Sequence, residues 1–282
     1  MSATDGAGEG RAAATPWLHR IGLNARATLA TLMRPPRRVM PWRSAREFAL
    51  LVAGAAVGVL AVMVTLDGWS IAQVPRLPAG LVEALNRFTD LGKGGFFLWP
   101  LGLAMLAIAL LDTSRLPRMP RLVLAAWTVR LAFVFTAIAL PGLFVTIVKR
   151  LIGRARPMVV VNDAYAYLPF GWKVDYASLP SGHATTAFAA LVAIGAIFPQ
   201  ARALMWIYAV LIALSRVVVT AHYPSDVLAG ALFGAAGAWL VQQWFAARGL
   251  GFAVTADGVV RPMPGPSLPR IVKALARRWP AA

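Results

Sequence analysis

The sequence has no cysteine, only three histidines and few acidic residues, and each scarcity excludes a class of protein. Among 282 residues there are 11 Asp or Glu against 28 Lys or Arg. Without cysteine, disulfides and thiol chemistry are excluded. The histidines His19, His183 and His222 are too few for a metal site built on several His or Cys ligands. Such a metal site is therefore hard to assemble, although carboxylates remain as potential ligands.

Apolar residues, by contrast, are abundant. Hydrophobic residues make up 59% of the chain and charged residues 14%, whereas a soluble domain averages about 25% charged residues. The mean hydropathy is +0.66, so we expect an integral membrane protein. The formal net charge of +17 is also typical of nucleic-acid-binding proteins. With such long apolar runs, however, the expected partner is a membrane surface and not a nucleic acid.

The apolar runs predict an all-α fold, an integral membrane bundle of six transmembrane helices. The expected spans are residues 48–66, 95–111, 122–148, 183–198, 203–221 and 226–246. They divide the chain into a basic N-terminal tail (1–46), a six-helix domain (47–246) and a basic C-terminal tail (247–282). Amphipathic surface helices are expected in the two tails, near residues 17–32 and 271–279. A disordered basic tail is the alternative for residues 1–46.

Six spans would place both termini on the same side of the membrane. Most of the 28 Lys and Arg residues fall on that side, which the positive-inside rule makes cytoplasmic. The lack of cysteine, the compact loops and the short chain favour a bacterial cytoplasmic membrane. The outer loops, residues 67–94, 149–182 and 222–225, hold most of the remaining basic residues. Because the rule does not expect cations there, we expect those residues to have a function.

Two stretches in the outer loops have the composition of an anion site. In the first, Lys149 and Arg156 are seven residues apart and would share a face if the third helix continues through them. A basic helix end in contact with lipid headgroups is the ordinary explanation. In the second, Ser181 and Gly182 begin the fourth span, where an N-cap and free N–H groups bind phosphate well. His183 beside them could donate a proton to a leaving oxygen.

The third stretch ends the fifth span and has a histidine with a carboxylate four residues later. Asp226 would hold one ring nitrogen of His222 and leave the other free for nucleophilic attack. Arg216 would neutralise an anionic substrate. Such a pair at a helix end is often merely structural. Here, however, all three stretches fall at one membrane face and include two of the three histidines.

Taken together, the stretches read Lys-x6-Arg-Pro, Pro-Ser-Gly-His and Ser-Arg-x5-His-x3-Asp. This pattern resembles the type 2 phosphatidic acid phosphatase (PAP2) superfamily, in its bacterial membrane lipid phosphatase branch, over about residues 48–246. It is matched without a substitution by Lys149, Arg156, Pro157, Pro180, Ser181, Gly182, His183, Ser215, Arg216, His222 and Asp226.

The resemblance implies a metal-independent phosphatase. His222 would attack phosphorus and become a phosphohistidine, Asp226 would orient it, and His183 would protonate the leaving group. The phosphoryl oxygens would be held by Lys149, Arg156, Ser181, Gly182 and Arg216. Fixed cations and N–H donors supply most of the catalysis in phosphoryl transfer, so the residue types agree with this implication.

The substrate expected from the resemblance is a phosphomonoester or diphosphate lipid in the membrane. Phosphatidate, phosphatidylglycerophosphate, undecaprenyl diphosphate and lipid A all suit such a site, and undecaprenyl diphosphate or another envelope lipid is favoured. A lipid phosphotransferase using the same site is one alternative, and a non-catalytic membrane scaffold or transporter is another. Vanadate haloperoxidases have a similar site but are soluble, which the six spans oppose. The sequence leaves the oligomeric state open.

Overall fold

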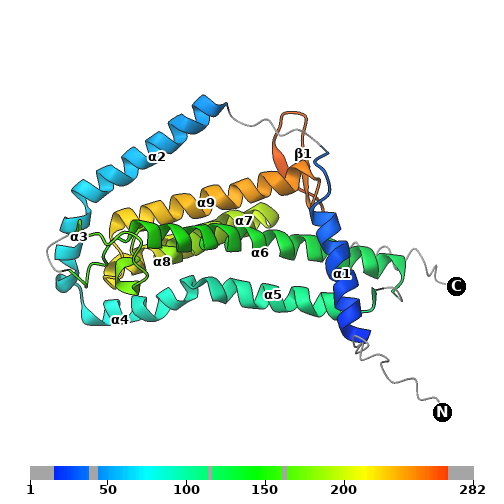
Figure 1. Ribbon diagram of the computed structural model, residues 1–282, viewed down its shortest axis with the longest axis horizontal. Helices are drawn as coiled ribbons and strands as arrows, with labels where there is room; N and C mark the ends of the chain where they lie inside the picture. The colour runs from blue at the N-terminus through cyan, green and yellow to red at the C-terminus, as the bar shows by residue number, and fades with distance from the viewer. Residues whose placement is uncertain (1–15, 38–43, 114–115, 161–163, 266–282) are drawn as a thin grey trace, which may run out of the picture.

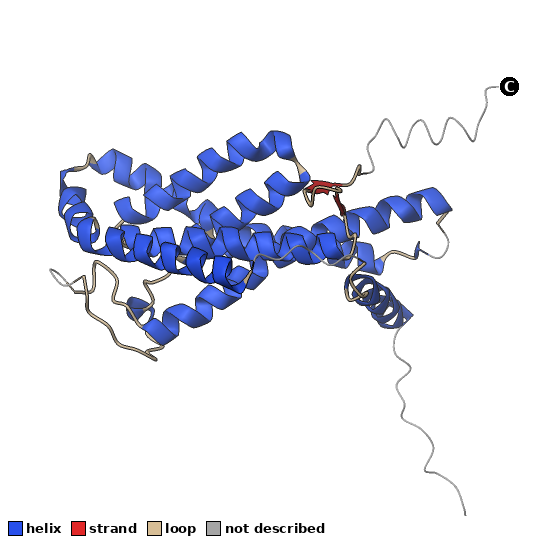
Figure 2. Ribbon diagram, turned by 90° about the horizontal axis from the view of Figure 1, so that it is seen from above, coloured by secondary structure: helices blue, strands red, loops and turns tan. Residues whose placement is uncertain are grey.

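The computed structural model describes residues 16–37, 44–113, 116–160 and 164–265, and these form a bundle of helices (Figures 1 and 2). The α-helices are α1 (Pro16–Leu32), α2 (Ala45–Thr65), α3 (Asp67–Gln73), α4 (Ala79–Phe88), α5 (Gly94–Leu110), α6 (Arg118–Ile152), α7 (Gly182–Ile197), α8 (Arg202–Val218) and α9 (Pro224–Ala247). The 3-10 helices are η1 (Val74–Arg76), η2 (Thr89–Gly92), η4 (Val174–Tyr176) and η5 (Pro199–Ala201). An antiparallel pair of strands, β1 (Phe252–Val254) and β2 (Val260–Pro262), follows α9.

Five helical stretches are long and apolar enough to cross a membrane. They are Ala45–Thr65, Ala79–Leu110, Arg118–Ile152, Pro199–Val218 and Pro224–Ala247. Large apolar side chains cover their outer surfaces, with Trp99 74% exposed and Val64 73% exposed. Contiguous exposed apolar surface of this kind is unfavourable in water and matches the interior of a bilayer. The expected helical membrane fold is therefore confirmed, and the chain is a multi-pass membrane protein.

Helix α7 differs from the other expected spans because it lies inside the bundle. It has 16 residues, and most of its alanines are fully buried between α6, α8 and α9. Small residues allow this close approach. A Cβ atom added at Gly230 or Gly234 of α9 would lie 2.3 Å from the Ser181 carbonyl oxygen or 2.2 Å from that of Thr185. Helix α9 is therefore pressed against the start of α7.

Two helix ends depart from the sequence-based expectation. Helix α6 continues to Ile152 and stops because Gly153 adopts a left-handed conformation (φ 65°), which favours glycine. Arg156 therefore lies beyond the helix, and the expected helical face shared with Lys149 is wrong. Helix α8 ends at Val218, before the expected residue 221, because Thr220 takes φ 52° and turns the chain.

Helix α1 lies across the end of the bundle opposite to α3 (Figure 1). The Asn24 side chain donates a hydrogen bond to the carbonyl oxygen of Ala109 (2.7 Å), and Arg34 donates to that of Gly249 (2.7 Å). The helix expected near residues 17–32 is thus present and docked on the bundle. The second surface helix, expected at 271–279, lies outside the described residues. The β1–β2 hairpin was not expected from the sequence; it packs Phe252 against Phe133, with ring centroids 4.8 Å apart.

Candidate active site

Four helix ends meet at one end of the bundle and bring the three sequence stretches together. Helices α6 and α8 end there, and α7 and α9 begin there. The Ser181 amide donates to the Asp226 carbonyl oxygen at 2.9 Å, which joins the second stretch to the third. A Cβ atom added at Gly182 would lie 3.9 Å from the Lys149 Nζ atom, which places the first stretch beside the second.

The tight turn between α8 and α9 fixes the position of His222. The amides of Ala221 and His222 both donate to the carbonyl oxygen of Arg216, at 3.1 and 3.2 Å. This wraps the chain around the end of α8 and buries His222, which is 3% exposed. Arg216 is 8% exposed, so a cation and an imidazole are both nearly buried at the end of α8.

A serine hydroxyl lies between His222 and Asp226. The His222 Nδ1 atom is 3.8 Å from Asp226 Oδ2, which is too long for a hydrogen bond. The Ser178 hydroxyl donates to that oxygen at 2.5 Å and lies 3.4 Å from Nδ1. The direct contact suggested by the sequence is therefore replaced by one through Ser178. Nothing in the sequence distinguishes this serine from other polar loop residues.

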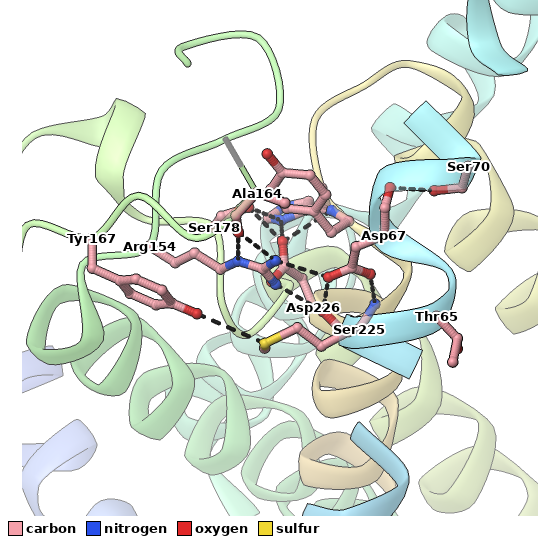
Figure 3. A network of polar contacts seen from close by, with 12 residues as sticks. Thr65, Asp67, Ser70, Arg154, Ala164, Tyr167, Ser178, Ser225 and Asp226 are labelled. Carbon is pink, nitrogen blue, oxygen red and sulfur yellow. Dashed lines mark hydrogen bonds and ion pairs between the residues drawn. The ribbon is translucent and has the colours of Figure 1, made fainter. Parts of the chain in front are cut away.

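Asp226 is also held by Arg154 in a fully buried network (Figure 3). Arg154 donates to Asp226 Oδ1 and to Asp67 Oδ2, both at 2.8 Å, and all three side chains are 0% exposed. The Tyr223 amide donates to Asp226 Oδ2 at 2.9 Å. From the sequence, Arg154 has no predicted role, and Asp67 is only the first residue of the outer loop 67–94. Their pairing was missed because they are far apart in the chain.

Side-chain atoms without hydrogen-bond partners gather in this region. In the described part of the chain, six buried side-chain polar atoms lack a partner. Four of them belong to candidate site residues: Arg156 Nε, Ser181 Oγ, His183 Nε2 and Arg216 Nε. Ser181 does occupy the N-cap position of α7, but its hydroxyl makes no capping bond, so that expected contact is absent. Because buried polar groups are normally paired, these atoms fit an anionic ligand with several oxygens.

The electrostatic surroundings keep His222 neutral and Arg154 charged. Burial lowers the pKa of His222, Asp226 opposes this, and Arg216 and Arg156 reinforce it. A neutral imidazole has a free lone pair and is a nucleophile. Burial alone would lower the pKa of Arg154, but the carboxylates of Asp226 and Asp67 outweigh it and raise the pKa. The network therefore contains a fixed positive charge.

The segment η2, from the loop at residues 67–94, also covers the site. Arg216 Nη1 donates to the Thr89 hydroxyl at 2.8 Å, and Thr89 is buried. A Cβ atom added at Gly92 would lie 3.1 Å from the His183 ring. The sequence predicts no functional residue in this segment. No cluster of three or more His, Cys, Asp or Glu side chains suited to a metal ion occurs among the residues that the structure describes.

Comparisons with known proteins point to one family. Residues 130–250 match the sequence model of the PAP2 superfamily. A lipid A 1-phosphatase of Rhizobium etli is 38% identical over 128 residues, which are 45% of this chain and 55% of that protein. A second, from Rhizobium johnstonii, is 39% identical over 128 residues, or 45% and 52% of the two chains. The chain thus spans about half the length of these curated relatives.

Two solved structures are more distant. LpxE of Aquifex aeolicus is 21% identical, with a TM-score of 0.47 over 64% of this chain and 96% of that one. The PAP2-type phosphatidylglycerolphosphate phosphatase of Bacillus subtilis is 19% identical, with a TM-score of 0.48 over 68% and 94%. The sequence match at 130–250 contains all three motifs. Through this region, the chain is similar to the PAP2 superfamily.

Proposed function

We propose that this protein hydrolyses a phosphate monoester or diphosphate of a membrane lipid through a phosphohistidine intermediate on His222. One observation carries the proposal: three stretches separated in sequence meet at four helix ends and surround one buried imidazole with cations and unpaired donors. Such donors and cations stabilise the charge that spreads over phosphoryl oxygens in the transition state.

In the proposed first step, His222 Nε2 attacks phosphorus, because Nδ1 faces Ser178 and Asp226. The bond from phosphorus to the lipid oxygen breaks, and His183 gives that oxygen a proton. Negative charge on the bound phosphate favours the protonated form of His183. The phosphoryl oxygens are held by Lys149, Arg156, Ser181, the Gly182 amide and Arg216.

In the proposed second step, water attacks the phosphohistidine. His183, now neutral, accepts a proton from this water, inorganic phosphate leaves, and the His222 imidazole is restored. Asp226 and the Ser178 hydroxyl stabilise the positive charge that the ring carries while it is phosphorylated. The cations replace the charge that a metal ion supplies in other phosphatases, so the proposal includes no metal or other cofactor.

A lipid A-type phosphate is the first substrate to test, because two relatives that share 38% and 39% identity with this chain are lipid A 1-phosphatases. Phosphatidate, phosphatidylglycerophosphate and undecaprenyl diphosphate follow. A lipid substrate agrees with the surroundings of the site, since the helices that extend from it carry exposed apolar side chains on the outer surface of the bundle.

We also infer that six helices, α2 and α5 to α9, cross the bilayer and that the site faces the outside. The 16 residues of α7 are about 24 Å long, which is short for a bilayer of about 30 Å. The long helices around α7 shield it from lipid. The positive-inside rule then assigns the end with α1 to the cytoplasm.

The test uses the full chain purified in detergent and a panel of these four lipid phosphates. Phosphate release is compared for the wild type, His222→Ala and a matched control, His19→Ala, whose side chain is exposed on α1 at the opposite end. We expect His222→Ala to abolish release and His19→Ala to retain it. Phosphate transferred to a second lipid instead of water would identify a phosphotransferase. No turnover on any substrate would overturn the proposal and favour a scaffold or transporter.

A further inference from the structure

The Arg154 side chain links two buried carboxylates from different parts of the bundle (Figure 3). Besides Asp226 and Asp67, its guanidinium donates to the Ser225 hydroxyl at 2.7 Å and to the Ala164 carbonyl oxygen at 2.9 Å. Asp67, at the start of α3, also accepts from the Ser225 amide and hydroxyl at 2.9 and 2.6 Å. The chain segment after α2 is therefore tied to the start of α9.

The network holds one positive and two negative charges, all excluded from solvent. Such an arrangement is stable only while the charges compensate each other and remain hydrogen-bonded. With Arg154 in place, Asp226 can remain a carboxylate without exposure to water. If the guanidinium were removed, Asp226 would lose its buried positive partner, and its protonated form would be favoured.

The ionised state of Asp226 determines the direction of the hydrogen bonds that reach His222. A carboxylate only accepts, so the single Ser178 hydroxyl hydrogen points to Asp226 Oδ2 at 2.5 Å. The Ser178 oxygen can then only accept from the imidazole, 3.4 Å away. Consequently the ring proton lies on Nδ1, and Nε2 has the free lone pair.

We propose that Arg154 and Asp67 are positioning residues, which act through Asp226 and Ser178 to hold His222 as the tautomer protonated on Nδ1. Their importance for turnover rests on the proposed function, whereas the tautomer does not. A clamp that only joined α3 to α9 would stabilise the fold but would leave the imidazole tautomer unchanged.

The first test measures the tautomer directly. The full chain is labelled with 15N-histidine in detergent, and the three rings are assigned with His19→Ala and His183→Ala. We expect one His222 tautomer with Nδ1–H in the wild type and a mixture in Arg154→Met. Arg154→Lys keeps the charge but lacks the planar fork that reaches both carboxylates, and we expect a mixture there too. It serves as the second variant if Arg154→Met does not fold.

A wild-type ring protonated on Nε2, or the Nδ1–H tautomer unchanged in the variant that folds, would overturn the inference. This readout needs no substrate. If the wild type shows no turnover, only the proposed function is refuted. If an Arg154 variant is active and its His222 tautomer is unchanged, only the positioning role is refuted.

The second test uses charge compensation. Arg154→Met should lower kcat by about 10- to 100-fold with little change in KM, an effect of the size seen when a partner that orients a metal-ligating histidine is lost. Asp67→Asn combined with Arg154→Met retains the net charge of the network, so we expect it to recover at least part of kcat and the single tautomer. Thermal unfolding of each variant identifies losses caused by instability. If the double variant had the same low kcat and the same mixture of His222 tautomers as Arg154→Met, the charge balance that the inference requires would be refuted.

Discussion

Gly230→Ala tests how closely the site depends on the packing of α9 against α7. The added Cβ atom would lie 2.3 Å from the Ser181 carbonyl oxygen and 3.2 Å from the Ala184 Cβ atom. Ordinary contact begins at 3.4 Å, so the two backbones must separate by about 1 Å, the difference between 3.4 and 2.3 Å. The Ser181 carbonyl oxygen and the Ala184 Cβ atom cannot rotate away as the end of a flexible side chain could, because both are fixed to the backbone.

This displacement sets the expected loss of stability and of activity in Gly230→Ala. Overpacking a close-packed interior costs about 1–3 kcal/mol, and replacing a helical glycine by alanine returns about 0.5–1 kcal/mol. The net loss of stability is therefore about 0–2.5 kcal/mol. Activity should suffer more. Ser181 belongs to the proposed phosphate site, and its amide donates a hydrogen bond to the Asp226 carbonyl oxygen. A displacement of such a group by about 1 Å costs about 100-fold in rate.

The control is Gly58→Ala in α2, where an added Cβ atom meets nothing within 4 Å. We expect it to match or slightly exceed the wild type in stability and to keep full activity. Both variants are compared by thermal unfolding in detergent and by phosphate release from a lipid phosphate. Equal activity and stability in Gly230→Ala and Gly58→Ala would refute the reasoning, because it would mean that α9 does not fix the position of Ser181.

Three further predictions concern the chemistry. His183→Ala should damage hydrolysis of a lipid phosphate far more than that of p-nitrophenyl phosphate, since only the alkoxide needs a proton to leave; equal losses would remove its role as general acid. Turnover should survive EDTA and be inhibited by vanadate, which mimics the five-coordinate phosphorus; loss in EDTA with recovery in magnesium would contradict this. Because the pKa of His222 is lowered, more than half of His222 still has a free lone pair at about pH 6.5, the ordinary histidine pKa, and the midpoint of its protonation lies at a lower pH. The acid limb of kcat/KM, corrected for substrate ionisation, should lie under that value, and a limb above it would show a raised pKa instead.

The sequence by itself determined the helical membrane fold and the place where the candidate residues gather. Apolar runs of bilayer length specify spanning helices whatever their neighbours are. Each motif lies at the end of such a run, so the sequence predicts that Lys149, Ser181 and His222 gather at one end of the bundle, where the helix ends meet. The ends of α6 and α8 were less predictable, because they depend on left-handed residues at Gly153 and Thr220.

Tertiary structure alone decided how His222, the proposed nucleophile, is held. Arg154 contacts Asp67 across 87 positions of the chain, and Ser225 contacts Asp67 across 158. Pairs so distant leave no periodic or local pattern, and a charged residue near a membrane boundary looks the same whether it is solvated or buried. Ser178 is likewise an ordinary loop serine until the fold inserts it between His222 and Asp226. Hydropathy thus fixes which end of the bundle holds the site, while the contacts that orient its groups exist only once the helices have packed.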